Sequence, residues 1–285
     1  MTVEADYKIT YAAPGEDGQV WNIATPFAQE RKGQAVLLLQ GGTDGFDNTP
    51  DITTRATVDR YGETATGLKI PAFGGTLKTV VGREDFDLRD IDRNWRQSWP
   101  LTHASEPPTW SVWNPYLTGR FIVADTGAHN RWLPIYRTAM TSLPNNYRGI
   151  FSYPCEVTWK SLAGTWFGPI RRFETGGQVA VGGHLRAAAR LRWDPTQDAT
   201  VTFPDRQTLT LTSAADASAG LRYINLDRGF AGQVTREDDT VDSITWSTFK
   251  GRVLGIELKP GRTYDWQLTG GVALEIVHRY LSPWE

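Results

Sequence analysis

Apolar and polar residues alternate along much of this chain, and this alternation limits its fold more than any other feature. Successive side chains of a β-strand point to opposite faces, so alternation with a period of two predicts a strand with one buried face. The pattern is clearest in the segments 7–11, 151–160, 185–193, 254–258, 264–268 and 272–280. We therefore expect a mainly β protein.

Short turns separate the last of these segments. Pro260-Gly261 lies between the segments 254–258 and 264–268, and Gly270-Gly271 lies before the last one. Two-residue turns usually join antiparallel neighbours, so the C-terminal part is predicted to be an antiparallel β-sandwich of short strands. Pro154 has no amide hydrogen to donate, so its strand is expected to lie at an edge or to carry a bulge there.

One segment, residues 87–99, predicts a helix. Asp87 can cap the free amides at its start, Asp90 and Asp92 suit its positive first turn, and apolar residues recur at nearly helical spacing. Trp95 and Trp99 belong to that apolar face. We expect them to pack the helix against its own sheet.

The chain is longer than most single domains, with 285 residues. Glycine and proline are frequent over residues 164–177, between two sets of predicted strands. We therefore predict an N-terminal β-domain with one helix, residues 1–173, and a C-terminal β-sandwich, residues 174–285. Segments 41–50 and 103–108 are rich in proline, glycine or acidic residues and are predicted to be long loops, more often simply exposed than interacting.

Charge argues against nucleic-acid and membrane binding. The sequence has 30 basic and 32 acidic residues, interspersed, with a net charge of −2. Sequence-specific DNA binding relies on a basic patch, although a conduit that must not grip DNA is compatible with this balance. We expect neither a signal peptide nor a membrane span, and so a protein made in a cytoplasm. The single cysteine, Cys155, is expected to pack as a small apolar group.

No catalytic, cofactor-binding or metal-binding residues are predicted. The four histidines are far apart in the sequence, and no lysine follows a glycine, which excludes a Walker loop. Acidic groups near residues 84–87 and 237–242 suit caps and turns, because they lack the spacing of a calcium loop. A pair of carboxylates facing each other across a cleft, as in a glycosidase, cannot be recognised from sequence, so an enzyme stays a weak alternative.

Exposed tryptophans could stack on sugars, and the chain has 12 of them. Several, however, lie in segments with the strand pattern, where a side chain that faces the core is the better interpretation: Trp159, Trp193, Trp246 and Trp266.

The order of these elements resembles a known family. A β-rich half with one helix at 87–99, the segment 110–115 and an aromatic link at 166–169 resembles the tail-tube-like N-terminal domain of siphophage distal tail proteins. The second half resembles their galectin-like sandwich. Its segment 258–263 (Leu-Lys-Pro-Gly-Arg-Thr) is similar to a turn common in this group. Its ending at 279–284 (Arg-Tyr-Leu-Ser-Pro-Trp) is similar to that of many actinobacteriophage minor tail proteins.

This resemblance implies a non-enzymatic virion protein at the tip of a long non-contractile tail. Such proteins form a ring, commonly a homohexamer, that surrounds the DNA channel and connects the tail tube to the tail-tip hub. The implied partners are further copies of the chain, the major tail tube protein and the hub protein, with tape measure and receptor-binding proteins as additional candidates. Tyr280 and Trp284 are expected to anchor the C-terminus to the body of the protein.

Two other functions compete with this one. A receptor- or glycan-binding tail module would use the second domain to recognise cell-wall sugars. A cell-wall hydrolase would need the carboxylate pair mentioned above. Neither has a sequence motif in its favour.

Overall fold

The structure of the chain is a computed structural model. It describes residues 7–26, 34–56, 63–83, 87–99, 109–125, 129–142, 150–213, 220–227, 232–249 and 255–284, with backbone alone for 54–56, 63–68 and 249. The chain forms two compact units. Unit 1 comprises Met1–Phe167 together with Leu281–Glu285, and unit 2 comprises Gly168–Tyr280. These limits differ from the predicted ranges at residues 168–173 and 281–285.

The described part of unit 1 is built from antiparallel strands and one helix, as its sequence predicts. Its elements are β1 (Tyr7–Ala12), β2 (Val20–Ala24), β3 (Val36–Asp44), β4 (Asp51–Ala56), β5 (Glu63–Lys69), β6 (Phe73–Val81), α2 (Leu88–Ser98), β7 (Gly119–Asp125), β8 (Asn130–Met140), β9 (Tyr153–Ser161) and β10 (Trp166–Phe167).

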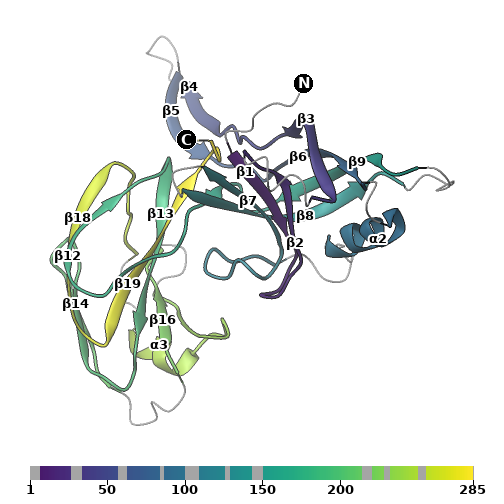
Figure 1. Ribbon diagram of the computed structural model, residues 1–285. Helices are drawn as coiled ribbons and strands as arrows, with labels where there is room; N and C mark the ends of the chain where they lie inside the picture. Colours follow the sequence, from purple (N-terminus) through teal and green to yellow (C-terminus); the bar gives the residue numbers. More distant parts are fainter. Residues whose placement is uncertain are drawn as a thin grey trace. The chain divides into compact units, whose positions relative to one another are not determined.

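Two sheets of unit 1 share the long strand β8 (Figure 1). Its first half pairs with β7, which continues to β1 and β2. Its second half pairs with β9, which continues to β6 and β3. The partner changes between Ile135 and Tyr136, and an irregularity between Arg137 and Ala139 follows directly. Since a bulge bends a strand, β8 can serve both layers of this unit.

Pro154 lies where the sequence predicts that it can be tolerated. Strand β9 pairs with β6 along its whole length, but β8 pairs only with residues 157–160. At Pro154, β9 therefore has one neighbouring strand in the described part of the chain. The missing amide hydrogen of proline interrupts no strand pairing on the other side.

Helix α2 begins and ends close to its predicted limits. Asp87 accepts a hydrogen bond from the backbone N–H of Arg89 at 2.9 Å, which is the expected cap. Leu88, Ile91 and Trp95 are buried, so the apolar face of the helix points into unit 1.

The described part of unit 2 is an antiparallel sandwich of two sheets with one helix. Its elements are β11 (Arg171–Phe173), β12 (Gly177–Val181), β13 (Leu185–Trp193), β14 (Ala199–Thr202), β15 (Thr208–Leu211), β16 (Arg222–Asn225), β17 (Val234–Arg236), α3 (Ser243–Phe249), β18 (Arg262–Gly270) and β19 (Val272–Tyr280). One sheet has the order β11-β19-β13-β16-β17 and the other β12-β18-β14-β15. Between them lies a core that includes Trp193, Leu274, Val201 and Trp266.

Three predictions for this unit are wrong. Gly270-Gly271 does not join neighbouring strands, because β18 and β19 belong to opposite sheets. In the segment 254–258, the described residues 255–257 form no strand, and Leu258 makes only an isolated bridge to Ala187. Trp246 lies on the helix α3 and not on a strand, although its side chain packs against the core as predicted. The Asp242 carboxylate caps this helix by accepting hydrogen bonds from the backbone N–H and the hydroxyl of Thr245. Asp242, directly before the helix, is the sequence signal that could have predicted it.

A buried carboxylate ties three strands of unit 2 together. Glu275 of β19 accepts hydrogen bonds from Arg172 of β11 at 2.9 and 3.0 Å, and from Arg190 of β13 at 2.7 Å. The Arg190 guanidinium also lies 3.9 Å from the ring centre of Tyr223 on β16. A buried charge is tolerated when partners of this kind satisfy it, and it becomes costly when one is removed.

We expect Glu275→Gln to destabilise unit 2 by about 3 kcal/mol, because it leaves Arg190 buried beside a neutral amide. Urea unfolding measures the change. The matched control is Glu257→Gln, whose ion pair with Arg186 at 2.6 Å involves a mostly exposed guanidinium and should contribute less than about 1 kcal/mol. Equal effects of the two substitutions would contradict this account.

His278 gives unit 2 a dependence on pH. It is buried, its Nε2 accepts a hydrogen bond from the backbone N–H of Gly182 at 3.3 Å, and burial, with a smaller effect of Arg171, lowers its pKa. The folded state therefore holds a neutral ring, while the unfolded chain takes up a proton near its ordinary value of about 6.5. Stability is full above that pH and falls as the pH drops towards the lowered pKa.

We therefore expect unit 2 to lose up to about 1.4 kcal/mol per pH unit on acidification from pH 6.5 to 5.5, on account of this one group. Urea midpoints at the two pH values measure the loss. In His278→Gln the difference between the two midpoints should shrink. An unchanged difference would show that another group is responsible.

Candidate functional site

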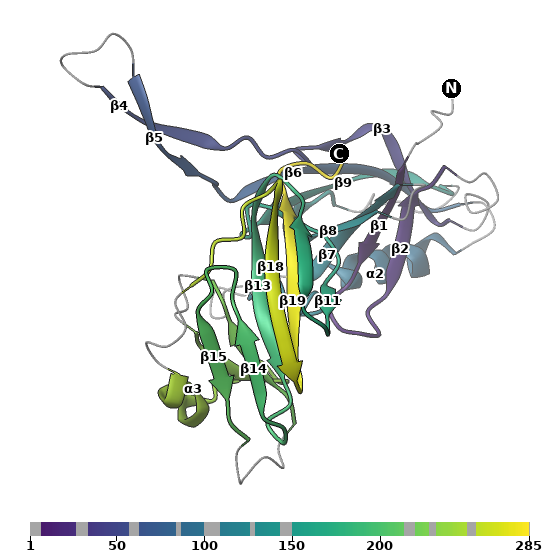
Figure 2. The same cartoon turned by 90° about the vertical axis from the view of Figure 1, so that its left-hand side faces the viewer.

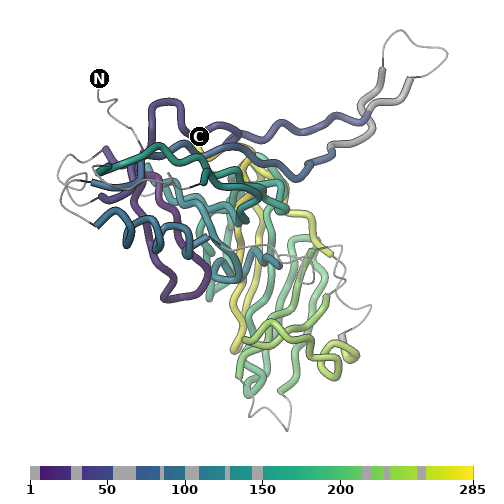
Figure 3. Tube along the Cα trace, turned by 90° about the vertical axis from the view of Figure 1, so that its right-hand side faces the viewer, coloured from purple at the N-terminus to yellow at the C-terminus, as the bar shows by residue number. Residues whose placement is uncertain are grey.

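The C-terminal tail, residues 281–284, lies on unit 1 and forms its candidate anchoring site (Figure 3). The Trp284 ring stacks on Phe46, with 5.9 Å between ring centres and 11° between planes. It also meets the edge of Tyr7 of β1 at 5.1 Å. The hydroxyl of Tyr7 donates to the Trp284 carbonyl at 2.8 Å. Tyr7, near the start of the described chain, and Trp284, at its end, therefore contact each other directly.

Backbone groups of the tail are also bonded to unit 1. The Asn48 N–H donates to the Leu281 carbonyl at 3.0 Å, and Arg131 Nη1 of β8 donates to the Ser282 carbonyl at 3.2 Å. Asn48 is itself held, since its side-chain amide donates to the carbonyls of Pro71 and Gly164. The tail therefore forms hydrogen bonds with separate segments of unit 1, and these contacts can fix its position there.

Phe46 is the centre of this site, although the sequence predicted an exposed loop there. Its ring lies 5.0 Å from Phe121, 5.6 Å from Trp159 and 5.5 Å from Trp166, in addition to Trp284. The Trp166 indole N–H donates to the Phe46 carbonyl at 2.8 Å. Nothing local marks this phenylalanine as buried, because all its partners are distant in sequence.

Tyr280, the other residue predicted to anchor the C-terminus, belongs to unit 2. Its ring meets the edge of His184 at 5.7 Å between ring centres. Cε2 of this ring would lie only 3.4 Å from a Cβ built on Gly168, the first residue of unit 2. The two predicted anchoring residues thus lie in different units, Tyr280 in unit 2 and Trp284 in unit 1.

Trp95 and Trp99 are buried in the interior of unit 1. The Trp99 ring stacks on Tyr11 of β1 at 3.8 Å with 4° between planes, and Trp95 meets Trp21 of β2 at 5.2 Å. The Tyr11 hydroxyl donates to the Ser98 carbonyl at 2.5 Å, and burial raises the pKa of this phenol. These contacts hold α2 against β1 and β2.

A polar cluster that sequence reasoning missed holds the other side of the helix. Tyr153 of β9 donates its hydroxyl proton to Asp92, and Arg96 donates to both carboxylate oxygens of Asp92 at 2.9 Å and to the Tyr153 oxygen at 3.0 Å. Burial, with the bond to Asp92, raises the Tyr153 pKa, so the phenol stays protonated and can donate. The i,i+4 spacing of Asp92 and Arg96 was visible in the sequence, but their partner on β9 was not.

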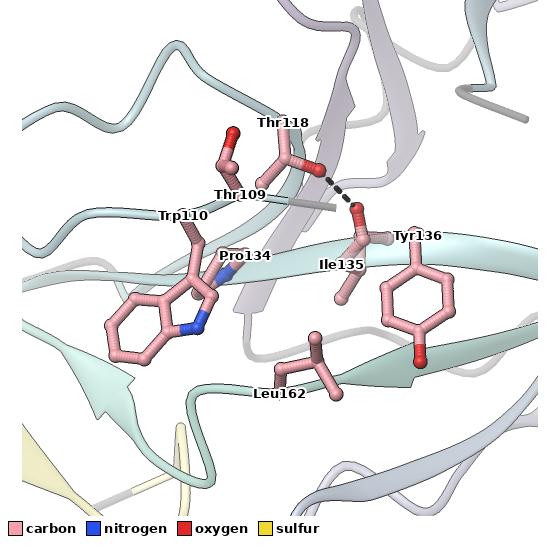
Figure 4. Close-up of a pocket in the computed structure, with 7 residues that line it drawn as sticks. All are labelled: Thr109, Trp110, Thr118, Pro134, Ile135, Tyr136 and Leu162. Carbon is pink, nitrogen blue, oxygen red and sulfur yellow. Dashed lines mark hydrogen bonds between the residues drawn. The ribbon is translucent and has the colours of Figure 1, made fainter. Parts of the chain in front are cut away.

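A small notch on unit 1 is lined by Thr109, Trp110, Thr118, Pro134, Ile135, Tyr136 and Leu162 (Figure 4). Its volume of about 10 Å³ is enough for one water molecule at most. The Thr118 hydroxyl is already used, since it donates to the Ile135 carbonyl at 2.8 Å. The notch is therefore too small for a substrate.

Residues with reactive side chains do not gather into a site in the described part of the chain. No group of three or more metal-ligating side chains occurs there. Cys155 is free and buried, and burial raises the pKa of its thiol. The acidic residues at 237–242 were predicted to serve caps and turns. Asp242 caps α3, and Asp238 accepts a hydrogen bond from the backbone N–H of Thr240 in a turn. Residues 84–86 and the predicted loop 103–108 lie outside the described residues. Among the described helices, none has the length and apolar character of a membrane span.

Comparison with known proteins identifies the fold. No family model and no curated protein matches the sequence at a significant level. The crystal structure of the Dit protein of phage SPP1, a hub adsorption apparatus of phages that infect Gram-positive bacteria, matches with a TM-score of 0.55 at 10% identity, over 96% of this chain and 98% of that one. This chain has the fold of the SPP1 distal tail protein. The predicted resemblance is thereby confirmed at the level of the fold.

A second solved structure agrees. A chain of the phage P2 baseplate, in its activated conformation with Ca, matches with a TM-score of 0.50 at 8% identity, over 95% of this chain and 98% of that one. Because both matches include nearly the whole of each chain, the fold is shared across both units.

We expect Trp284→Ala to destabilise unit 1 by about 2 kcal/mol, because the ring buries apolar surface against two other rings. Urea unfolding measures the change. Trp284→Phe keeps a ring on Phe46 and should recover more than half of the loss. If the alanine variant is as stable as the original protein, the tail is not an anchor.

Proposed function

We propose that this protein is a structural component of the tip of a long non-contractile phage tail. In this proposal, six copies form a ring at the distal end of the tail tube, around the DNA channel, and the ring connects the tube to the tail-tip hub. The observation that carries it is the match of fold to the SPP1 distal tail protein over 96% of this chain. The protein acts there by shape and self-association and catalyses no reaction.

The two units take different parts in the proposal. Unit 1, which corresponds to the predicted N-terminal domain 1–173, forms the ring and contacts the tube above and the hub below. Unit 2, predicted as residues 174–285, is the galectin-like sandwich and projects outward. Tape measure and receptor-binding proteins are further candidate partners. A head-to-tail contact whose rotation closes gives a cyclic oligomer, so one repeated interface is sufficient for the ring.

Two properties of the chain support a channel-forming role. Its net charge of −2, with both signs interspersed, gives no general attraction for DNA, and DNA must pass without being held. The anchored tail closes unit 1 with residues from the far end of the chain. That closure makes unit 1 a complete building block.

Glycan binding by unit 2 receives no support from its tryptophans. Trp193 and Trp266 are buried in the sandwich core, and Trp246 is half-buried and packs against that core. A ring that fills a core is not available to stack on a sugar. We therefore retain the structural role alone.

Negative-stain electron microscopy and light scattering of the purified protein test this proposal. We expect a six-fold annulus with an open centre and a mass about six times the 31.8 kDa of one chain. A protein that stays monomeric at every concentration, or that hydrolyses cell-wall material, would contradict it.

A further inference from the structure

The end of strand β19 is held by an imidazole ring whose hydrogen bond requires the ring to be neutral. Strand β19 runs between β13 and β11 (Figure 2), and His278 lies near its end, just before the tail. The residue is buried. Its Nε2 accepts a hydrogen bond from the backbone N–H of Gly182 at 3.3 Å. An imidazole nitrogen can accept such a bond only while it carries no proton.

Gly182 belongs to the turn that joins the two sheets of unit 2. Strand β12, before the turn, pairs with β18 in one sheet, and β13, after it, pairs with β19 in the other. Gly183 has a φ of +88°, and a Cβ on this residue would lie 2.5 Å from the Arg279 carbonyl oxygen. Only glycine permits this approach in this backbone conformation. The turn therefore lies directly on the last residues of β19.

Two backbone hydrogen bonds complete the contacts at this strand end. The N–H of His184 donates to the Arg279 carbonyl at 2.9 Å, and the N–H of Gly168 donates to the His278 carbonyl at 2.9 Å. Amide and carbonyl groups do not titrate near neutral pH. Of these three bonds, the one from Gly182 to the His278 ring is therefore the one that a proton breaks.

The surroundings of the His278 ring oppose a positive charge. Burial lowers the pKa of this ring, and the charge of Arg171 on β11 lowers it further. The neighbouring histidine, His184, faces the ring of Tyr280 instead. When His278 takes up a proton, both of its nitrogens become donors, so Nε2 then faces the N–H of Gly182 without a bond. Protonation therefore disfavours the closed turn.

The adjacent ion pair responds to acid in the opposite direction. Asp227, directly after β16, accepts a hydrogen bond from Arg279 at 3.4 Å. Burial raises the pKa of this carboxyl, although the charge of Arg279 acts against the change. A raised carboxyl pKa means that the folded state takes up a proton more readily than an exposed chain does, so acid favours the closed arrangement at Asp227. Opening on acidification must therefore come from His278.

We infer that His278, Gly182 and Gly183 form an acid-sensitive clasp on the end of β19. At neutral pH the clasp is closed and fixes the strand end from which the tail departs. On acidification the ring takes up a proton, its bond to Gly182 is lost and the turn opens, while the centre of the sandwich stays folded. This inference goes beyond the proposed function and does not depend on it, because every contact of the clasp lies within one copy of unit 2.

Amide hydrogen exchange of the full-length protein, read by mass spectrometry and corrected for the intrinsic effect of pH on exchange, tests the clasp. We expect the protection of residues 182–184 to fall by up to about tenfold per pH unit between the ordinary histidine pKa of about 6.5 and the lowered pKa of the closed clasp. Leu191 and Leu274, paired at the centre of β13 and β19, should keep their protection. A parallel fall at these two residues would show that the whole unit unfolds, and the clasp would be wrong.

Two substitutions assign the response to its residue. His278→Gln removes the titration but keeps an acceptor, since the amide oxygen of glutamine can take the Gly182 N–H. The protection of residues 182–184 should then change less than about twofold over the same pH range. Asp227→Asn, the matched control, removes the charge next to the clasp and should retain the full response. An acid response in His278→Gln equal to that of the natural protein, or its loss in Asp227→Asn, would overturn the inference.

Deuterium uptake at the Cε1 carbon of His278 supplies a measurement on the unmodified protein, should the glutamine variant not fold. The rate of this uptake follows the protonation of the ring and so gives its pKa. We expect a midpoint below about 6.5. A midpoint at or above that value would show that the ring is not the buried acceptor that the clasp requires.

Discussion

The side chain of Phe46 contacts aromatic rings from β7, β9, β10 and the C-terminal tail, and the closure of unit 1 depends on this group. Two sheets that share β8 enclose a space that only large side chains can fill. Aromatic rings do this with much apolar area and few rotatable bonds, and they pack well edge to face. Because Trp284 is one of them, unit 1 is complete only when the last residues of the chain are in place.

Buried polar groups then fix how the elements meet. Asp92 and Tyr153 hold α2 to β9, and Glu275 holds β11 and β13 to β19. Apolar packing alone tolerates small shifts of one element along another, whereas a buried carboxylate is satisfied in one arrangement only. The ring proposed above would require such fixed geometry, since small errors in each subunit add up around a closed ring.

Local patterns predicted the elements well and their partners less well. Alternation located β1, β9, β13 and β19, and Asp87 with its apolar spacing located α2, because these signals come from neighbours in sequence. The Gly270-Gly271 turn was misjudged because a two-residue turn permits either a hairpin or a crossing to the opposite sheet. Trp284 was predicted to anchor the C-terminus, but its place on Phe46 could not be predicted, since the two residues are 238 positions apart in the sequence and no pattern marks Phe46 as buried. The Asp92–Tyr153 contact was hidden for the same reason.

The path of the chain has a mechanical consequence. It leaves unit 1 after Phe167, forms unit 2, and returns at Leu281, so unit 2 is a covalent loop closed by the tail. Tension applied between the two chain ends acts first on Tyr7 and Trp284, which hold each other directly. Until that contact shears, the sandwich carries no load. Tension between the two ends therefore strains unit 1 before it loads unit 2.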